Sequence, residues 1–183
     1  MLKIKAREAR PAKSWWNVCK MLMQSTFFWV IFLFVIPPVI HHIEKQSIPY
    51  FLFSSADFFT ISLVIFSLGG TLAITSGLFM AIYGQGTPLP LDCPRKLVIV
   101  GPYKYVRNPM AIGGLSQGFA VGLFLGSLGV ILYTISGLII WNFFVRRWEE
   151  QDLCERFGDS FIDYRIKVYC WWPRFSAYVP KTN

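Results

Sequence analysis

Residues 84–113 read GQGTPLPLDCPRKLVIVGPYKYVRNPMAIG, and the rest of the chain is organised around this stretch. It holds five of the eleven prolines and four basic residues, and strongly apolar segments lie on both sides of it. Proline and glycine at this density prevent a continuous helix. Between helices that cross a bilayer, irregular polar backbone is tolerated only where protein buries it or where it lines a cavity. The sequence therefore predicts a pocket at the membrane face.

The composition indicates a membrane protein. Of the 183 residues 54% are hydrophobic and only 15% are charged, against about 25% charged in soluble domains, and the mean hydropathy is +0.46. A single domain over residues 1–183 is expected at this length. The net charge of +8 does not form the basic stripe of a nucleic-acid-binding protein, because the positive residues lie in the connections between apolar runs. We therefore expect no nucleic-acid partner.

We expect an all-α fold in which four apolar segments cross the membrane, residues 21–40, 58–83, 110–125 and 130–145. Each approaches or exceeds the length that a membrane helix needs. Residues 1–20 are basic and end near Trp15 and Trp16, a pattern typical of an interfacial helix. A cleaved signal peptide is disfavoured, because the apolar run that follows is long and ends at Pro37 and Pro38 without a small-residue cleavage site.

The basic residues predict the topology. Six lie in residues 1–20, four in residues 84–109 and seven in residues 146–183, whereas Lys45 alone lies in the first connection. Seventeen against one is a clear positive-inside pattern, so we expect both termini, the pocket stretch and the tail on the cytoplasmic side of the cell inner membrane or the endoplasmic reticulum. The four cysteines would share that reducing side, and His41 and His42 would lie on the other, so no metal site is expected.

Small residues predict where helices pack closely. Gly69, Ala73 and Gly77 recur every four residues in the second apolar segment, and the third has a glycine ladder with the same spacing: Gly114, Gly118, Gly122 and Gly126. Residues 126–129 predict a tight turn that makes a hairpin of the third and fourth segments. In the tail, apolar residues at helical spacing predict a cytoplasmic helix interrupted at Gly158.

The pocket stretch contains three groups of candidate residues, each with a second interpretation. Gly84 and Gly86 would let a ligand approach the backbone, or they simply stop a helix. The apolar run 97–100 with Tyr103 would form a slot for a flat ring, or it packs against protein. Residues 107–109 begin the third apolar helix with a proline in its first turn, where free N–H groups would bind a carboxylate or Asn108 would serve only as a cap.

Glu149 and Glu150 follow the fourth segment directly. They would bind hydroxyls or a cationic group of a ligand, or they are solvated or paired with Arg146 at helical spacing. Taken together, the candidates suit a ligand with an aromatic ring, hydroxyls, a carboxylate and a positive charge, and S-adenosylmethionine has all four. The candidate residues include no adjacent nucleophile and base. Methyl transfer needs neither, because the sulfonium already activates the methyl group and catalysis can rest on alignment and desolvation.

The motifs GxGTPxP, LVxxGPYxYVRNPM and EExxLxxxFGxxFxxYxxxVxxWxP occur in this order between residues 83 and 173. This pattern resembles the integral-membrane methyltransferases that include isoprenylcysteine carboxyl methyltransferase and phosphatidylethanolamine N-methyltransferase, and above all their small prokaryotic members. The resemblance implies S-adenosylmethionine as cofactor. The residues expected to bind it are Gly84, Gly86, Leu97, Val98, Gly101, Tyr103, Arg107, Asn108, Pro109, Glu149 and Glu150. The residues expected to act in catalysis are Asn108, Arg146 and Glu150.

Two departures from the family pattern concern the pocket. Asn108 stands where the family often has histidine, and Ala111 stands where it often has tyrosine. Asparagine can still donate to a carboxylate, but the lost tyrosine leaves the acceptor open among a lipid amine, a prenylcysteine carboxylate and a small thiol. Two other functions compete with methyl transfer. An NADPH-dependent sterol-type reductase is disfavoured by its much longer chains, and a non-catalytic membrane scaffold would leave the complete motif set unexplained.

Overall fold

The computed structural model describes residues 7–49, 52–88 and 92–180 of the chain. In these ranges the regular structure is helical, and β pairing is limited to two isolated bridges, Glu8 with Cys93 and Leu52 with Ser127. The predicted all-α class is therefore confirmed. Within the described ranges, three helices are long and apolar enough to cross a membrane.

The first of these helices is longer than the sequence predicts. Helix α1 (Ser14–Trp29) continues through a π-helical turn (Val30–Val35) into α2 (Ile36–Ser47), which gives one helix of 34 residues in place of the predicted 21–40. Described residues 7–13 are not helical, so the interfacial helix expected at residues 1–20 does not form there. The backbone instead pairs with the pocket stretch, since the N–H of Ala9 donates to the Cys93 carbonyl at 3.0 Å. Residues 1–6 lie outside the described part.

Pro37 and Pro38 lie inside this helix, as the predicted segment 21–40 implies. A proline cannot donate to the carbonyl four residues earlier, and its ring crowds that carbonyl. The wider π-helical turn directly before Ile36 relieves this conflict, and both prolines then lie in the first turn of α2.

The second long helix confirms the predicted segment 58–83. A short 3₁₀ turn (Ala56–Phe58), α3 (Phe59–Phe79) and a π-helical turn (Met80–Gly84) form one helix of 29 residues. The helix ends at Gln85, whose φ of 58° is left-handed. The predicted pocket stretch begins at this break.

The predicted hairpin is present, with different helix lengths. Helix α4 (Pro109–Leu125) has 17 residues, about 26 Å at 1.5 Å per residue, which is shorter than a hydrocarbon core of about 30 Å. Helix α5 (Leu128–Ile140), a π-helical turn (Trp141–Val145) and α6 (Arg146–Phe157) form one continuous helix of 30 residues. The fourth apolar segment and the start of the charged tail are thus a single rod, which carries Glu149 and Glu150 beyond the apolar part.

Helices α3 and α4 make the closest helix contact through Gly113, a residue outside the predicted glycine ladder. A Cβ atom on Gly113 would lie 2.5 Å from the Gly69 carbonyl oxygen and 2.8 Å from the Ala73 nitrogen. The face of small residues predicted on α3 therefore packs against α4, because the α4 backbone lies directly on Gly69 and Ala73. Gly77 faces Met21 of α1 instead.

Two glycines of the predicted ladder of α4, Gly118 and Gly122, face α5. A Cβ atom on Gly118 would lie 2.9 Å from the Thr134 hydroxyl oxygen, and one on Gly122 would lie 2.7 Å from the Ile131 side chain, whereas one on Gly114 would meet nothing within 4 Å. At Gly126 the predicted turn is present, with φ of 62°.

Glu44 of α2 holds the first helix against this turn. Its carboxylate accepts hydrogen bonds from the Ser127 hydroxyl and from the Gly129 N–H, the latter at 2.6 Å. The Glu44 side chain is buried. The turn thus contains no charged residue of its own and binds one from α2.

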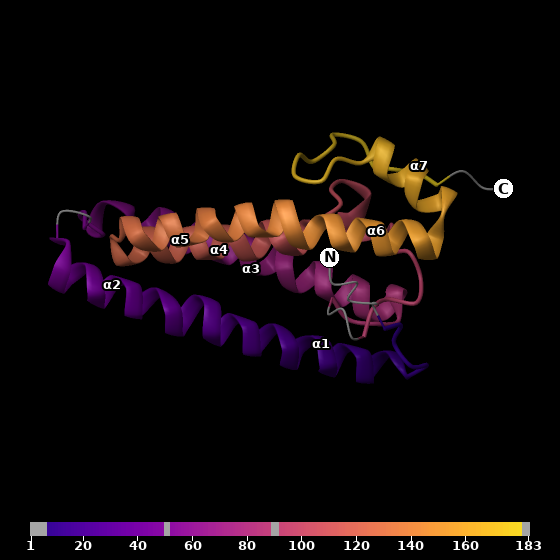
Figure 1. Cartoon of the computed structure of the whole chain (residues 1–183), viewed down its shortest axis with the longest axis horizontal. Helices are drawn as coiled ribbons and strands as arrows, with labels where there is room; N and C mark the ends of the chain where they lie inside the picture. The colour runs from indigo at the N-terminus through magenta and orange to yellow at the C-terminus, as the bar shows by residue number, and fades with distance from the viewer. Residues whose placement is uncertain (1–6, 50–51, 89–91, 181–183) are drawn as a thin grey trace.

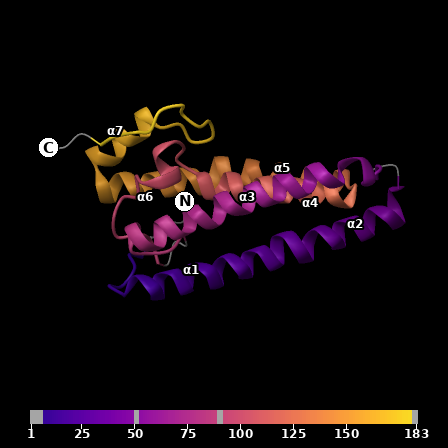
Figure 2. The same ribbon diagram turned by 180° about the vertical axis from the view of Figure 1, so that it is seen from behind.

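The polar elements gather at the opposite end of the bundle (Figures 1 and 2). The chain turns at Gly158, with φ of 51°, into α7 (Asp159–Lys167), which lies across α6 on the side away from α1. The pocket stretch, α6, α7 and the described N-terminal residues all lie at this end. Residues that the sequence predicts to share a site are thus on one face of the bundle.

Substituting alanine at two neighbouring glycines tests the α3–α4 contact. Gly113→Ala should lower the free energy of unfolding by about 1–3 kcal/mol, since its Cβ meets backbone that cannot move freely. Gly114→Ala is the matched control and should be neutral or stabilising by up to about 1 kcal/mol, because alanine is the better helix former. Thermal unfolding in detergent measures both, and equal midpoints for the two variants would contradict the contact.

Candidate active site

Two arginines from distant parts of the chain share the carboxylate of Glu150. Nη1 of Arg107 donates to Glu150 Oε1 at 2.6 Å, and Nη1 of Arg146 donates to the same oxygen at 3.2 Å. The three side chains are 12%, 23% and 16% exposed in the order Arg107, Arg146 and Glu150. Charge-assisted hydrogen bonds at this low exposure are stronger than surface ion pairs. Two guanidinium groups on one carboxylate also leave an excess positive charge, which favours an anionic ligand.

Arg107 also binds the C-terminal segment (residues 168–178) to the pocket stretch. Its Nε donates to the Val168 carbonyl at 2.7 Å, and its backbone N–H donates to the Tyr169 carbonyl at 3.0 Å. Two further backbone hydrogen bonds join the same segments, from Arg174 to Tyr105 at 2.9 Å and from Tyr178 to Lys104 at 3.0 Å. The sequence predicted that the tail 146–183 completes the site, but it indicated no candidate residue in this segment, because nothing in its local pattern shows which residues it will meet.

Asn108 occupies the position before α4, as predicted, but its side chain does not cap the helix. The side-chain amide donates to Cys170 Sγ at 3.3 Å. Pro109 is the first residue of α4 and is fully buried, so the helix start is rigid. The side chain of Asn108 thus contributes a second contact between the pocket stretch and the C-terminal segment.

Asn142 was not among the sequence candidates, and it joins the same cluster. Its side-chain oxygen accepts a hydrogen bond from Trp171 Nε1 at 2.9 Å, and its backbone carbonyl accepts one from Arg146 Nε at 3.3 Å. An asparagine within an apolar membrane segment is costly unless it has partners. The presence of Asn142 in the apolar run 130–145 therefore indicates a buried polar contact, and this pattern is visible in the sequence.

Tyr103 presents a buried hydroxyl group with no hydrogen-bond partner among the described residues. Its side chain is 5% exposed, and its carbonyl accepts a hydrogen bond from the Tyr164 hydroxyl at 2.7 Å. Burial, and next the nearby Glu149 and Tyr164, raise the pKa of Tyr103 well above its usual value. The hydroxyl is therefore neutral and available to a ligand.

Glu149, the neighbour of Glu150, has no hydrogen bond or ion pair to another described residue. It belongs to α6, which is charged and lies beyond the apolar part of its helix. Burial first, then the charges of Glu150 and Asp152, raise the pKa of Glu149 to about 7, and Arg107 opposes the shift. Glu149 also raises the pKa of Tyr103, so its charge acts on the Tyr103 hydroxyl. A ligand with hydroxyl or cationic groups would satisfy both.

The apolar run of the pocket stretch packs against protein. Leu97 and Ile99 pack on the small core of Phe161, Tyr164, Val168 and Tyr178, which belongs to α7 and the C-terminal segment. Val98 is 7% exposed. The packing interpretation thus accounts for this run, and the run also fixes α7 over the pocket stretch.

Internal packing also accounts for the three glycines of the predicted site. A Cβ atom on Gly84 would lie 2.7 Å from Val98 Cγ2, and one on Gly86 would lie 2.7 Å from the Cys93 carbonyl oxygen. Gly101 has a φ of 57°, and a Cβ atom on it would lie 2.7 Å from the Phe79 ring. The structure brings Gly101 next to Tyr103, whereas the described contacts of Gly84 and Gly86 are with residues 93–98.

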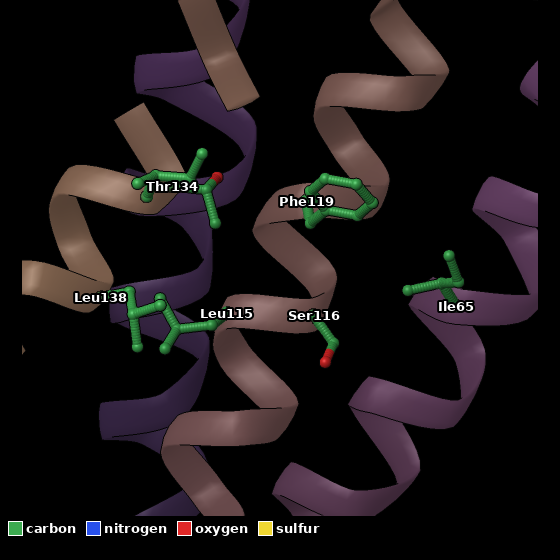
Figure 3. Close-up of a pocket in the computed structure, with 7 residues that line it drawn as sticks. Ile65, Leu115, Ser116, Phe119, Thr134 and Leu138 are labelled. Carbon is green, nitrogen blue, oxygen red and sulfur yellow. The ribbon is translucent and has the colours of Figure 1, made fainter. Parts of the chain in front are cut away.

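Two cavities lie outside this cluster. One of about 270 Å³ lies between α3, α4 and α5 (Figure 3) and is lined by Ile65, Leu115, Ser116, Phe119, Thr134, Ile135 and Leu138. Apart from two hydroxyl groups this lining is apolar, so it suits a hydrocarbon chain and not a charged cofactor. The other, about 330 Å³, lies beside the N-terminal segment. Among the described residues no group of three or more metal-ligating side chains could hold a metal ion.

Long apolar helices that end in a partly buried cluster of arginines and acids define a membrane protein with a polar site at one end of its bundle. A sequence model of the phospholipid methyltransferase family matches residues 58–160, more than half of the chain. The chain therefore belongs to this family of integral-membrane methyltransferases, and the predicted resemblance is confirmed. The match runs from the start of the second long helix into α7 and includes every predicted site residue. A comparison with curated proteins gave no significant match.

Replacing Glu150 with glutamine tests whether the shared carboxylate holds the cluster together. Glu150→Gln should lower the free energy of unfolding by about 3 kcal/mol, because it leaves two partly buried guanidinium groups unpaired. Glu155→Gln makes the same charge change at an exposed position of the same helix and should have an effect below about 0.5 kcal/mol. Denaturant unfolding in detergent measures both, and a Glu150→Gln variant as stable as the control would contradict the role of the pair.

Proposed function

We propose that the protein transfers the methyl group of S-adenosylmethionine to a lipophilic acceptor at the cytoplasmic face of the membrane. One observation carries the proposal: Tyr103 has a buried hydroxyl group without a partner among the described residues, and the charge of Glu149, the neighbour of the paired Glu150, acts on it. Membership of a methyltransferase family supports the reaction class. The concentration of basic residues at one end of the bundle supports the cytoplasmic placement of that end and of both termini.

The donor set fits S-adenosylmethionine. Arg107, Asn108 and the N-terminal turn of α4 offer hydrogen-bond donors and positive charge for its carboxylate. Glu149 offers an acceptor for ribose hydroxyls or the amino group, and the Tyr103 hydroxyl needs a partner that no described residue provides. When bound, S-adenosylmethionine supplies a methyl group already activated on a sulfonium. The apolar support of this site would come from Leu97, Val98, Gly101 and Pro109. Gly84 and Gly86 would contribute indirectly, by allowing residues 93–98 to pack closely against the backbone.

The predicted catalytic residues would act by binding and orientation. Glu150 is held by two guanidinium groups, and the Asn108 amide is held by Cys170. Neither group is free to move a proton, so a general-base role is disfavoured. Arg146 lies one helical turn before Glu150 and would orient the reacting end of the acceptor. Alignment and exclusion of water are the contributions that such a site can make to methyl transfer.

The acceptor is proposed to enter from the bilayer between helices. The cavity between α3, α4 and α5 supports this, because its lining is apolar and it lies within the helix bundle (Figure 3). Leu138 is eight residues before Arg146 in one continuous helix, about 12 Å at 1.5 Å per residue. A chain of several carbons would span that distance. A lipid amine, a prenylcysteine carboxylate and a small lipophilic thiol all remain candidates.

Methyl transfer is tested with membranes that contain the protein and S-adenosylmethionine labelled on its methyl group. Label should enter a product that partitions into organic solvent, and Arg107→Ala should reduce the rate about 100-fold, as loss of a preorganised charged donor does. Glu155→Gln serves as the unaffected control. No labelled product with the unaltered protein, or an unchanged rate with Arg107→Ala, would contradict the proposal.

Two tyrosine substitutions distinguish a ligand-facing hydroxyl from a structural one. Tyr103→Phe should leave stability unchanged, because no described residue binds its hydroxyl, and should weaken binding of S-adenosylhomocysteine about fivefold, the worth of one hydrogen bond. Tyr164→Phe removes the hydrogen bond to the Tyr103 carbonyl and should cost about 1 kcal/mol of stability. Calorimetric titration and thermal unfolding measure the two effects. A Tyr103→Phe variant that binds normally would place the hydroxyl outside the cofactor site.

A further inference from the structure

A second polar cavity lies on the opposite side of the pocket stretch from α7. Its volume is about 330 Å³, and it is formed by the N-terminal segment (residues 7–12), the start of α1 and one residue of the pocket stretch. The residues that line it are Arg7, Glu8, Arg10, Pro11, Ala12, Trp16, Lys20 and Asp92. The predicted cofactor residues are not among them.

Two guanidinium groups of this cavity have no ion pair with another described residue. Lys20 is paired with Asp92, and Glu8 is paired with Arg95 at 3.7 Å. No hydrogen bond or ion pair joins the side chain of Arg7 or Arg10 to another described residue. Two unpaired guanidinium groups in one cavity favour a group with several acceptor oxygens, since each can bind such a group with two parallel hydrogen bonds.

The position of the cavity identifies where such a group would come from. Trp15 and Trp16 are 62% and 49% exposed at the start of the helix Ser14–Ser47, and the apolar part of that helix follows them. Exposed tryptophans at the end of an apolar helix lie at the level of the lipid head groups. Basic residues directly beside such a helix attract anionic lipids. The cavity is thus at the depth of lipid phosphates.

We propose that this cavity binds the phosphate of an anionic phospholipid, with Arg7 and Arg10 as the main donors and Trp16 against the glycerol end of the lipid. The site is separate from the methyl-transfer site and does not depend on that function. Arg7 and Arg10 are both exposed, so their guanidinium groups are accessible to a phosphate at the membrane surface. The non-helical backbone of residues 7–13 places both side chains on the same cavity.

The bound lipid would also support the pocket stretch. The Cys93 N–H donates to the Arg7 carbonyl at 2.9 Å, the Ala9 N–H donates to the Cys93 carbonyl at 3.0 Å, and Arg156 of α6 donates to the Pro94 carbonyl. Residues 92–95 therefore lie between the lipid cavity and the helix that carries Glu150. Anionic lipid should stabilise the protein through this connection.

The test is native mass spectrometry of the full chain in detergent, titrated with phosphatidylglycerol or with phosphatidylcholine of the same acyl chains. We expect one tightly held phosphatidylglycerol and no comparably held phosphatidylcholine. Arg7→Gln with Arg10→Gln should weaken phosphatidylglycerol binding on the order of 25-fold, because each basic residue near an anionic surface contributes roughly a fivefold factor. Arg165→Gln with Arg174→Gln changes the net charge equally on the C-terminal side and should leave binding within about twofold, since no residue of that side lines the cavity.

Three results would overturn the proposal. Equal binding of the two lipids would remove the phosphate charge as the recognised feature, and equal weakening by both double variants would show attraction by net charge alone. Displacement of phosphatidylglycerol by millimolar inorganic phosphate or glycerol phosphate would identify a soluble anion as the ligand. Thermal unfolding midpoints of both double variants, measured without added lipid, check that each variant is folded.

Discussion

The carboxylate of Glu150, shared by Arg107 and Arg146, is the interaction on which the polar end of this protein depends. Arg107 comes from the pocket stretch and also holds the backbone of the C-terminal segment. Arg146 and Glu150 lie one turn apart on the rod that continues out of the apolar bundle. The carboxylate thus joins the pocket stretch to this rod, and Arg107 adds the C-terminal segment. The Tyr103 hydroxyl, which has no partner among the described residues, and Glu149 are what the proposed cofactor would bind.

Helix packing determines where this cluster forms. The backbone of α4 lies on Gly69 and Ala73 of α3, and this contact fixes the start of α4, where Asn108 and Pro109 stand. The unbroken helix Leu128–Phe157 carries the acids to the same level. The small core under α7 then holds the apolar run of the pocket stretch. Close packing in the apolar bundle therefore sets the positions of the residues that form ion pairs at its end. This arrangement is consistent with the proposed enzyme, which would bring together a polar cofactor and a lipophilic acceptor.

The sequence predicted those features of the fold that depend on residues close together in the chain. The second apolar segment, the turn at Gly126, the break after Gly84 and the start of α4 follow from hydropathy, glycine and proline, and the structure has them all. The π-helical turn before Pro37, which resolves the conflict of the prolines with a continuous helix, was not predictable from those residues alone. The ladder of α4 was predicted as a close-packing face, but spacing cannot tell which neighbour a face will meet. The partners of Asn108 and Asn142 lie 62 and 29 residues away, and no local pattern encodes such pairs.

Hydrogen–deuterium exchange of the purified protein, with and without S-adenosylhomocysteine, tests whether the pocket stretch, the acidic turn of α6 and the C-terminal segment form one ligand site. The ligand should slow exchange in residues 97–109, 146–150 and 164–171 together, while α2 and the turn at Gly126 stay unchanged. Protection confined to residues 84–96, or no protection at all, would contradict the account.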